Sequence, residues 1–507
     1  MSAVPARDVA DLAQRYGVAR LLPAIARYVA QQRWSGARGS GVVDVELADA
    51  GVLIDGECTI LFTVVRARLD ARHETRFALP IGLRPLGDPL AERAPGFMIG
   101  EASLHGHDVF AYDAAGDPLY IHWLWNAMRE SRSVRTARAE LRFAAIAPDA
   151  FEDADPDVRW LGTEQSNTSM ALGGSIFLKH LRRVEGGPSH ELEMAEALDL
   201  AGFRHMAPLV GTALYQPDGS APTLLALAQP YLHNGAEGWA LALTSLRDLY
   251  AQAEEAPVDD AAQRHAVVED QGGAFTAEAG RLGAVVAEMH TALAQRSLPE
   301  ALAPVPLTKD RLREWADAMA GELDSLLGRF DGALDPLRLA RTRVEEHFAA
   351  LQALAPGGLC TRVHGDLHLG QVMRTDSGWY ILDFEGEPNR SAEQRRERSS
   401  PLRDVAAMLR SFDYAAAAGL VERTQPGSAE YERLRGVGDA WAQINREAFW
   451  AAYLDALGAE VLPAPGAALT LVRAFEVQKA VYEVGYELGH RPSWAHIPLD
   501  FLLRGAE

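Results

Sequence analysis

The chain has 507 residues, 48% of them hydrophobic and 23% charged, which is the balance of a soluble globular protein. This length predicts more than one domain. The net charge of −21 argues against nucleic acid as a partner, because phosphate contacts need a surplus of Lys and Arg. No run approaches the roughly 20 apolar residues of a membrane span, and the 2 cysteines lie far apart without metal-ligand spacing. We therefore expect a cytoplasmic enzyme without a membrane or nucleic-acid partner.

The first half of the chain is expected to begin with a helix and continue as antiparallel sheet. Apolar residues recur with helical spacing over residues 9–32. Short alternating runs separated by Asp and Gly turns follow over residues 41–120. Residues 158–179 form a second set of short runs, in which Gly173-Gly174 predicts a tight hairpin turn.

Helices are expected to dominate from Glu191 onward. Residues 251–280 are rich in Glu, Asp, Ala and Gln with little periodicity, and we interpret them as an exposed insertion between helices. The last third, from about Thr308, is predicted to be helical except around one polar motif between Val363 and Glu387.

That motif carries three oxygen-bearing side chains, Asp366, Gln371 and Asp383, around a predicted hairpin. Residues 371–374 and 379–383 flank the turn-forming Thr-Asp-Ser-Gly, so the two runs should pair. Because the start of the first strand then lies beside the end of the second, Gln371 and Asp383 should meet, with Asp366 on the preceding loop.

This arrangement has the parts that phosphoryl transfer needs. Two oxygen donors could hold Mg²⁺, and a third carboxylate could accept the proton of a substrate hydroxyl. A lone Asp before a strand is more often a cap or turn residue, but the joint pattern of residue types and spacings favours the catalytic interpretation.

The motif resembles the aminoglycoside-phosphotransferase-like kinases, and most closely the actinobacterial maltokinases and related glucosamine kinases. The residues that carry this resemblance are His364-Gly365-Asp366-Leu367-His368 and Asp383-Phe384-Glu385-Gly386-Glu387-Pro388. It implies an α+β, bilobal kinase-like fold with an N-terminal cap over 1–150, an N-lobe over 151–235 and a helical C-terminal lobe over 236–507. It also implies that Asp366 is the catalytic base and that Gln371 and Asp383 are the magnesium ligands.

The same resemblance implies a site for ATP. A turn over the phosphates would contain Ser166, Asn167, Thr168 and Ser169. Lys179 would pair with the phosphates and with a helix carboxylate from residues 191–196, where Glu193 and Glu196 both stay open because they lie one turn apart. Gln229 and Tyr231 would belong to the connection between lobes that binds adenine, with the donor N–H coming from a residue such as Tyr231 because Pro230 has none.

The acceptor site is expected on a late helix. Four residues at spacings of three, four and seven share one helical face, which suits a sugar ring and its hydroxyls, although an aromatic stripe is more often core: Lys479, Tyr482, Glu483 and Tyr486. Asp404 is either a substrate contact or only the first-turn residue of a helix. His368, Glu385 and Trp494 are further candidates.

The expected activity is transfer of phosphate from ATP, with Mg²⁺, to a small sugar or amino sugar. Carboxylates from Glu385, Glu387, Asp404 and Glu483 around the acceptor would favour an ammonium group, so glucosamine phosphorylated at its 6-hydroxyl is the preferred hypothesis. Maltose converted to maltose 1-phosphate is the alternative. An aminoglycoside phosphotransferase and a non-catalytic kinase-like binding protein are further alternatives.

Overall fold

The computed structural model describes residues 8–36, 41–69, 74–104, 106–152, 156–162, 167–254, 258, 260–330, 332, 334–458 and 460–504. The chain forms two compact units. The first runs to Leu192 and takes up the chain again from Ala207 to Leu232, and the second contains Glu193–Met206 and the chain from His233 onward. None of the described helices is long and apolar enough to cross a membrane.

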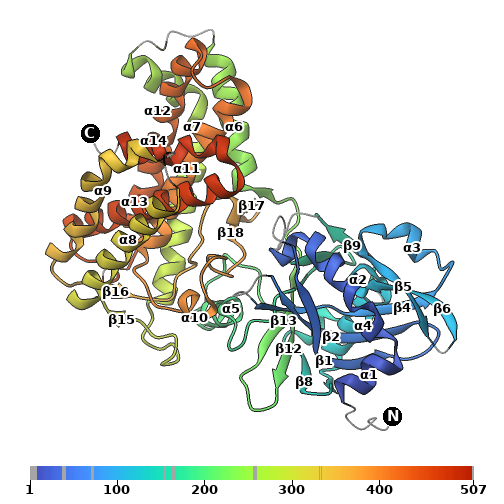
Figure 1. Ribbon diagram of the computed structural model, residues 1–507. Coiled ribbons are helices and arrows are strands. Elements are labelled where there is room, and N and C mark those ends of the chain that lie inside the picture. Colours follow the sequence, from blue (N-terminus) through green and yellow to red (C-terminus); the bar gives the residue numbers. More distant parts are fainter. Residues whose placement is uncertain are drawn as a thin grey trace. The chain divides into compact units, whose positions relative to one another are not determined.

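The first unit begins with two helices and a six-stranded antiparallel sheet (Figure 1). One helix was predicted over residues 9–32, but Gly17 adopts a left-handed conformation (φ 69°) and divides it into two. The sheet has the order β1-β2-β4-β6-β5, with β3 paired to β2. Its strands are β1 (Asp44–Ile54), β2 (Thr59–Arg68), β3 (Glu74–Ala78), β4 (Ile81–Pro85), β5 (Met98–Leu104) and β6 (His107–Asp113). The helices of this part are α1 (Val9–Arg15), α2 (Val18–Gln31), α3 (Leu90–Arg93) and α4 (Pro118–Arg129).

Both faces of this first sheet are buried, which explains the nearly continuous apolar sequence of β2. Leu61 and Val65 pack against α1 and α2, while Ile60, Phe62 and Val64 lie in a second core that also contains α4. Successive side chains of a strand point to opposite faces, so one strand contributes to two cores. The antiparallel sheet predicted for residues 41–120 is thereby confirmed, although its last residues begin α4.

A seven-stranded antiparallel sheet forms the rest of the first unit, in the order β7-β8-β12-β13-β11-β10-β9. Its strands are β7 (Ser133–Arg135), β8 (Ala139–Ala145), β9 (Val158–Leu161), β10 (Thr168–Leu172), β11 (Ile176–His180), β12 (Gly211–Pro217) and β13 (Thr223–Pro230). Strands β7 and β8, which the expected boundary at 150 assigns to the cap, thus belong to this second sheet. The predicted hairpin is confirmed: Gly173 (φ 54°) and Gly174 (φ 71°) both adopt the left-handed conformation that a tight turn between β10 and β11 requires.

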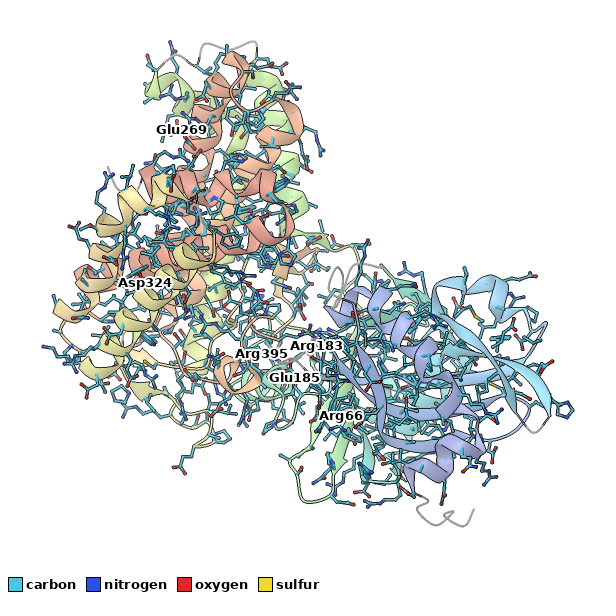
Figure 2. The ribbon with its side chains drawn as sticks, viewed as in Figure 1. Arg66, Arg183, Glu185, Glu269, Asp324 and Arg395 are labelled. Carbon is cyan, nitrogen blue, oxygen red and sulfur yellow. The ribbon has the colours of Figure 1, made fainter. Side chains whose placement is uncertain are left out.

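The two sheets are joined by the segment after β11. Ala78 of β3 donates its N–H to the Arg182 carbonyl at 2.8 Å, and the Val184 N–H donates to the Arg76 carbonyl at 2.9 Å. Arg183 and Glu185 mark this segment in Figure 2. The cap sheet therefore continues by hydrogen bonds into the second sheet.

The second unit is mostly helical. Its helices are α6 (Gly238–Ala253), α7 (Ala261–Leu293), α8 (Lys309–Arg329), α9 (Asp335–Ala353), α10 (Ala392–Arg395), α11 (Leu402–Arg423), α12 (Ala429–Ala456), α13 (Pro465–His490) and α14 (His496–Arg504), while α5 (His190–Leu200) crosses the boundary between the units. A three-stranded sheet contains β14 (Ala236–Glu237), β17 (Val372–Thr375) and β18 (Gly378–Ile381), and β15 (Val305–Pro306) pairs with β16 (Leu359–Cys360). The expectation of an exposed insertion over residues 251–280 is wrong for its larger part, because α7 packs along α12 and buries Val268 and Phe275.

Candidate active site

The loop between β16 and β17 is fixed by hydrogen bonds to the first turn of α11. Asp404 accepts hydrogen bonds from the backbone N–H groups of His364 (2.7 Å) and Gly365 (2.9 Å), and its Oδ2 lies 3.2 Å from Nε2 of His290 on α7. Asp404 is fully buried. Burial alone would raise the pKa of this carboxyl, but the bonds and charges around it outweigh burial and hold the pKa below its usual value. Asp404 therefore positions the loop, and its place in the first turn of α11 is the alternative that these contacts favour over a substrate contact.

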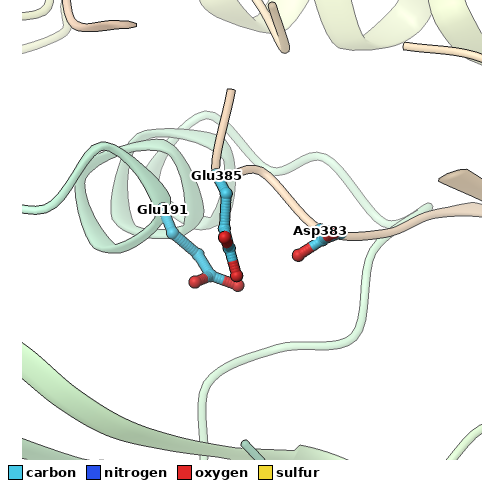
Figure 3. Close-up of side chains that lie close together, drawn as sticks. All are labelled: Glu191, Asp383 and Glu385. Atoms are coloured by element: carbon cyan, nitrogen blue, oxygen red, sulfur yellow. The ribbon is translucent and has the colours of Figure 1, made fainter. Parts of the chain in front are cut away.

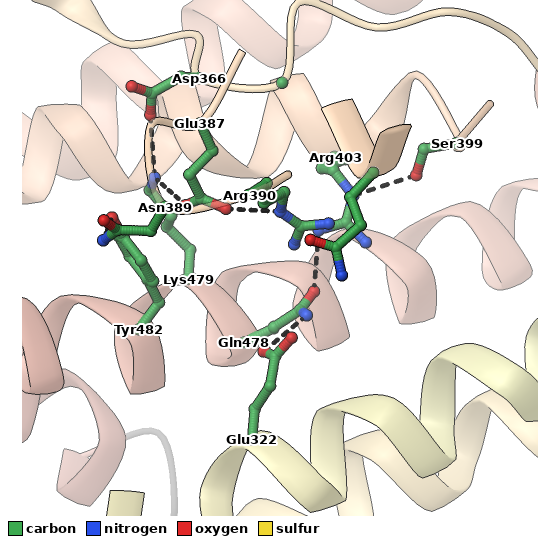
Figure 4. Close-up of polar contacts among 12 residues, drawn as sticks. Glu322, Asp366, Glu387, Asn389, Arg390, Ser399, Arg403, Gln478, Lys479 and Tyr482 are labelled. Atoms are coloured by element: carbon green, nitrogen blue, oxygen red, sulfur yellow. Dashed lines mark hydrogen bonds and ion pairs between the residues drawn. The ribbon is translucent and has the colours of Figure 1, made fainter. Parts of the chain in front are cut away.

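The loop presents Asp366 to the ammonium group of Lys479 on α13 (Figure 4). Nζ of Lys479 lies 3.1 Å from Oδ1 of Asp366 and 3.2 Å from Oε1 of Glu387. Arg390 in turn donates from Nε to the other oxygen of Glu387 at 2.7 Å. Two carboxylates thus share one ammonium group, and the second carboxylate is fixed by a guanidinium.

These contacts determine the charge of Asp366. Burial alone would raise its pKa, but the ammonium of Lys479 is the largest opposing influence and holds the pKa below its usual value. The pKa of Glu387 is lowered in the same way, by Lys479 and Arg390 against burial. Burial lowers the pKa of His368, which favours its neutral form. Asp366 is therefore ionised at neutral pH, as a proton acceptor must be.

The helix that carries Lys479 is itself fixed by its preceding residue. Gln478 accepts a hydrogen bond from Nη1 of Arg403 at 3.1 Å and donates one to Glu322 of α8 at 2.8 Å (Figure 4). Because α8, α11 and α13 are tied together at this point, the Lys479 side chain starts from a defined position.

Gln371 and Asp383 are brought together as the hairpin predicted. β17 and β18 pair with Val372 opposite Ile381, and the Leu382 N–H donates to the Gln371 carbonyl at 2.9 Å. Nε2 of Gln371 then lies 3.2 Å from Oδ2 of Asp383. Asp383 has a left-handed backbone (φ 59°), which is uncommon for a residue other than glycine and often occurs at functional sites.

Glu385 lies on the same loop as Asp383, and their carboxylate oxygens come within 4.8 Å of one another (Figure 3). Asp383 is exposed and Glu385 is partly exposed. Carboxylate and amide oxygens are the ligands that Mg²⁺ takes in proteins, so the donors on this loop fit such an ion.

In the first unit, the buried Lys179 of β11 forms an ion pair with a carboxylate of α5. Nζ of Lys179 lies 2.8 Å from Oε1 of Glu191. The expected partners were Glu193 or Glu196, and this is corrected. Glu193 instead binds Arg362 (2.9 Å) and Arg396 (2.8 Å) in the second unit. Because α5 begins at His190, Glu191 lies in its first turn, and this starting point decides which carboxylate faces the strand.

The predicted phosphate turn is only partly described. Ser166 lies outside the described residues. Asn167 precedes β10, Thr168 begins it, and Ser169 is buried opposite Lys179. The hydroxyl oxygen of Thr168 accepts a hydrogen bond from Nε of Arg182 at 2.8 Å, so this side chain takes part in the packing of the lobe.

The predicted connection between lobes falls where the chain leaves the first unit, after Leu232. Nε2 of Gln229 donates to the Ala207 carbonyl at 2.7 Å, within the first unit. The Tyr231 N–H donates to the Ser175 carbonyl at 2.7 Å. An N–H that is already used within the sheet does not fit the expected role of adenine donor, so this part of the prediction is corrected.

The four residues predicted for the acceptor face of α13 divide into two groups. The rings of Tyr482 and Tyr486 stack at 6.4 Å, and the ammonium of Lys479 lies 4.8 Å from the centre of the Tyr482 ring. Glu483 instead faces Nη2 of the buried Arg410 at 2.7 Å. Lys479, Tyr482 and Tyr486 thus form one surface beside the loop, and Glu483 is engaged elsewhere.

The remaining candidates have structural contacts of their own. His368 caps the short turn before β17 and accepts the Gly370 N–H at 3.0 Å. Trp494 stacks on Tyr414 with ring centres 6.1 Å apart. Sequence reasoning missed Asn389, whose amide donates to the Tyr482 hydroxyl at 2.9 Å, and Arg390. Both residues directly follow the Glu-Gly-Glu-Pro stretch of the motif, and this position in the sequence could have identified them as candidates.

Known proteins resemble this chain in its cap and along most of its length. Residues 28–117 match the maltokinase N-terminal cap domain. A glucosamine kinase of Streptacidiphilus jiangxiensis is 30% identical over 364 residues, which are 70% of this chain and 75% of that protein. A glucosamine kinase of Mycolicibacterium smegmatis is 30% identical over 344 residues, which are 67% and 77% of the two chains.

Solved structures show the same fold. A glucosamine kinase in complex with glucosamine, ADP and inorganic phosphate aligns with a TM-score of 0.61 at 24% identity, over 93% of this chain and 97% of that one. A second crystal form of glucosamine kinase aligns with a TM-score of 0.62 over 94% and 99%. The expected α+β kinase-like fold with an N-terminal cap is confirmed.

Proposed function

This chain belongs to the glucosamine kinase family, and we propose that it transfers the γ-phosphate of ATP to the 6-hydroxyl of glucosamine. The observation that carries the kinase activity is the loop geometry, in which an ionised Asp366 precedes the hairpin that pairs Gln371 with Asp383. The choice of acceptor is supported by the two glucosamine kinases that this chain resembles at 30% identity.

In the proposed reaction, Asp366 accepts the proton of the acceptor hydroxyl as that oxygen attacks phosphorus. Asp404 keeps the loop in the geometry that attack requires, because it fixes the two backbone N–H groups before Asp366. Lys179, oriented by Glu191, would hold the phosphates of ATP.

Mg²⁺ would be held by Gln371 and Asp383, with Glu385 as a further oxygen donor. When bound, it would neutralise the charge that develops on the phosphate oxygens.

The acceptor would lie against Lys479, Tyr482 and Tyr486, where aromatic faces and charged groups alternate. Asp366 and Glu387 already hold one ammonium group between them, that of Lys479. Because this pairing neutralises both carboxylates, the choice of an amino sugar rests on the relatives at 30% identity and not on these two side chains.

The proposal is tested by comparing kcat/KM for glucosamine, glucose, N-acetylglucosamine and maltose with ATP and Mg²⁺. Replacing the amino group with hydroxyl or N-acetyl is expected to cost about tenfold or more, because a charged hydrogen bond is lost. Maltose is the second candidate, since residues 28–117 match the maltokinase cap. A clear preference for maltose would replace the proposed acceptor.

A further inference from the structure

A cavity of about 370 Å³ lies in the second unit, where α11, α12 and α14 meet. Its walls contain none of the residues that we assign to the nucleotide, the metal or the acceptor. Five arginines line it, contributed by four helices: Arg410, Arg435, Arg446, Arg473 and Arg504.

Arginine is the commonest charged residue of the lining, in a chain that is strongly acidic overall. Five arginines and three aspartates line the cavity, whereas the whole chain has 49 basic and 70 acidic residues. Carboxylates orient these arginines: Glu483 and Glu476 bind Arg410 and Arg446 at 2.7 Å, and Glu432 and Asp439 bind Arg435 and Arg504. The cavity therefore offers a cluster of oriented guanidinium groups, which favours an anionic ligand with several oxygen atoms.

The arginines at the base of the cavity are held in fixed positions. Asp413 binds both Arg410 (3.2 Å) and Arg446 (3.0 Å). The guanidinium carbons of Arg410 and Arg473 lie 4.0 Å and 4.9 Å from the centre of the Phe501 ring. Donors that are already immobilised lose little entropy when a ligand binds.

One buried donor among the described lining residues lacks a hydrogen-bond partner. It is Nε of Arg410, whose side chain is only 1% exposed. A buried donor without a partner is costly, which indicates that a bound group satisfies it in the working protein.

We propose that this cavity binds a phosphate-bearing small molecule, at a site distinct from the catalytic centre. Planar guanidinium groups match phosphate oxygens with paired hydrogen bonds. The volume lies within the range of small-molecule sites, and Tyr250, Tyr431 and Gln443 add surfaces for an organic part of the ligand.

The test is calorimetric titration of the full-length protein with inorganic phosphate and with glucose 6-phosphate in phosphate-free buffer. The double variant Arg435→Ala/Arg504→Ala is expected to bind both probes at least about tenfold more weakly, because charged hydrogen bonds are lost. Activity measured without these anions should equal that of the parent, since neither arginine belongs to the catalytic centre.

The matched control is Arg311→Ala/Arg313→Ala on α8. Arg311 and Arg435 are both 40% exposed, and Arg313 and Arg504 are 55% and 52% exposed. The control removes the same charge from the same unit and should keep the parent affinity. A third variant, Gln443→Glu, adds a negative charge to the wall and should also weaken binding. Absence of binding by the parent, or equal affinity in both double variants, would overturn the proposal.

Discussion

At the Asp366 carboxylate, burial and the neighbouring ammonium act in opposite directions, and the ammonium prevails. Asp366→Asn removes the proton acceptor while the loop keeps its bonds to Asp404. We expect kcat to fall by roughly 10²–10⁴-fold, the usual effect of losing a general base. The melting temperature should change little, because Lys479 retains Glu387. Steady-state kinetics and thermal unfolding check this, and residual activity within about tenfold of the parent would exclude Asp366 as the base.

The pH dependence of activity in variants of Lys479 provides a second test of the base. In Lys479→Met the main influence that lowers the pKa of Asp366 is lost, while burial, which raises it, remains. The acidic limb of the kcat/KM profile should therefore move to higher pH, so that activity falls more in acid than in alkali. Lys479→Arg keeps the charge and should keep the limb near its parent position. Parallel loss at every pH would mean that Lys479 does not tune the base.

Two glutamates of helix α5 bind different partners, Glu191 binding Lys179 and Glu193 binding two arginines. We therefore expect the first to affect ATP binding and the second to affect stability. Glu191→Gln weakens the pairing that orients Lys179, so kcat/KM for ATP should fall by about tenfold or more. Glu193→Gln weakens the contacts to Arg362 and Arg396, so it should cost about 1–3 kcal/mol of stability.

The two variants are compared by ATP kinetics and by urea unfolding. An ATP defect in Glu193→Gln without one in Glu191→Gln would reverse the assignment of the Lys179 partner.

Elements with local signals could be predicted from the sequence. Gly173-Gly174 and the turn that ends at Gly378 predict hairpins, because their residue types favour tight turns. The first hairpin determines where Lys179 lies, and the second determines where Asp383 lies. The partner of Lys179 could not be predicted, because it depends on the residue at which α5 begins. Asp404 was seen as the first-turn residue of a helix, but its burial beneath the loop depends on packing between distant segments.

The part of α7 that was predicted to be an exposed insertion was also decided by packing between distant segments. Its first half is polar and weakly periodic, and its apolar residues are buried only because α12 packs along it. Helices of this kind are stabilised by tertiary contacts more than by their own sequence.

Within the first unit, the cap and the second sheet share a buried ion pair. Arg182, just after β11, binds Asp113 at the end of β6 at 2.9 Å, and both side chains are 0% exposed. The hydroxyl of Tyr28 on α2 donates to the same carboxylate at 2.9 Å. Asp49 of β1 makes a second link, because it accepts hydrogen bonds from Thr136 (2.5 Å) and from Tyr215 of β12 (3.1 Å). We infer that the cap does not unfold independently of the sheet beside it.

Asp113→Asn tests this coupling. The substitution leaves the Arg182 charge buried without its counter-charge, which typically costs about 3–5 kcal/mol. Asp218→Asn is the control, since Asp218 forms an exposed pair with Arg135 whose loss should cost about 1 kcal/mol or less. Hydrogen exchange measured by mass spectrometry should show strands β1–β6 and β8–β13 losing protection together in Asp113→Asn, because the carboxylate contacts both parts. Loss of protection in the cap strands alone would show that the cap is an independent folding unit and that the shared ion pair does not couple it to the seven-stranded sheet.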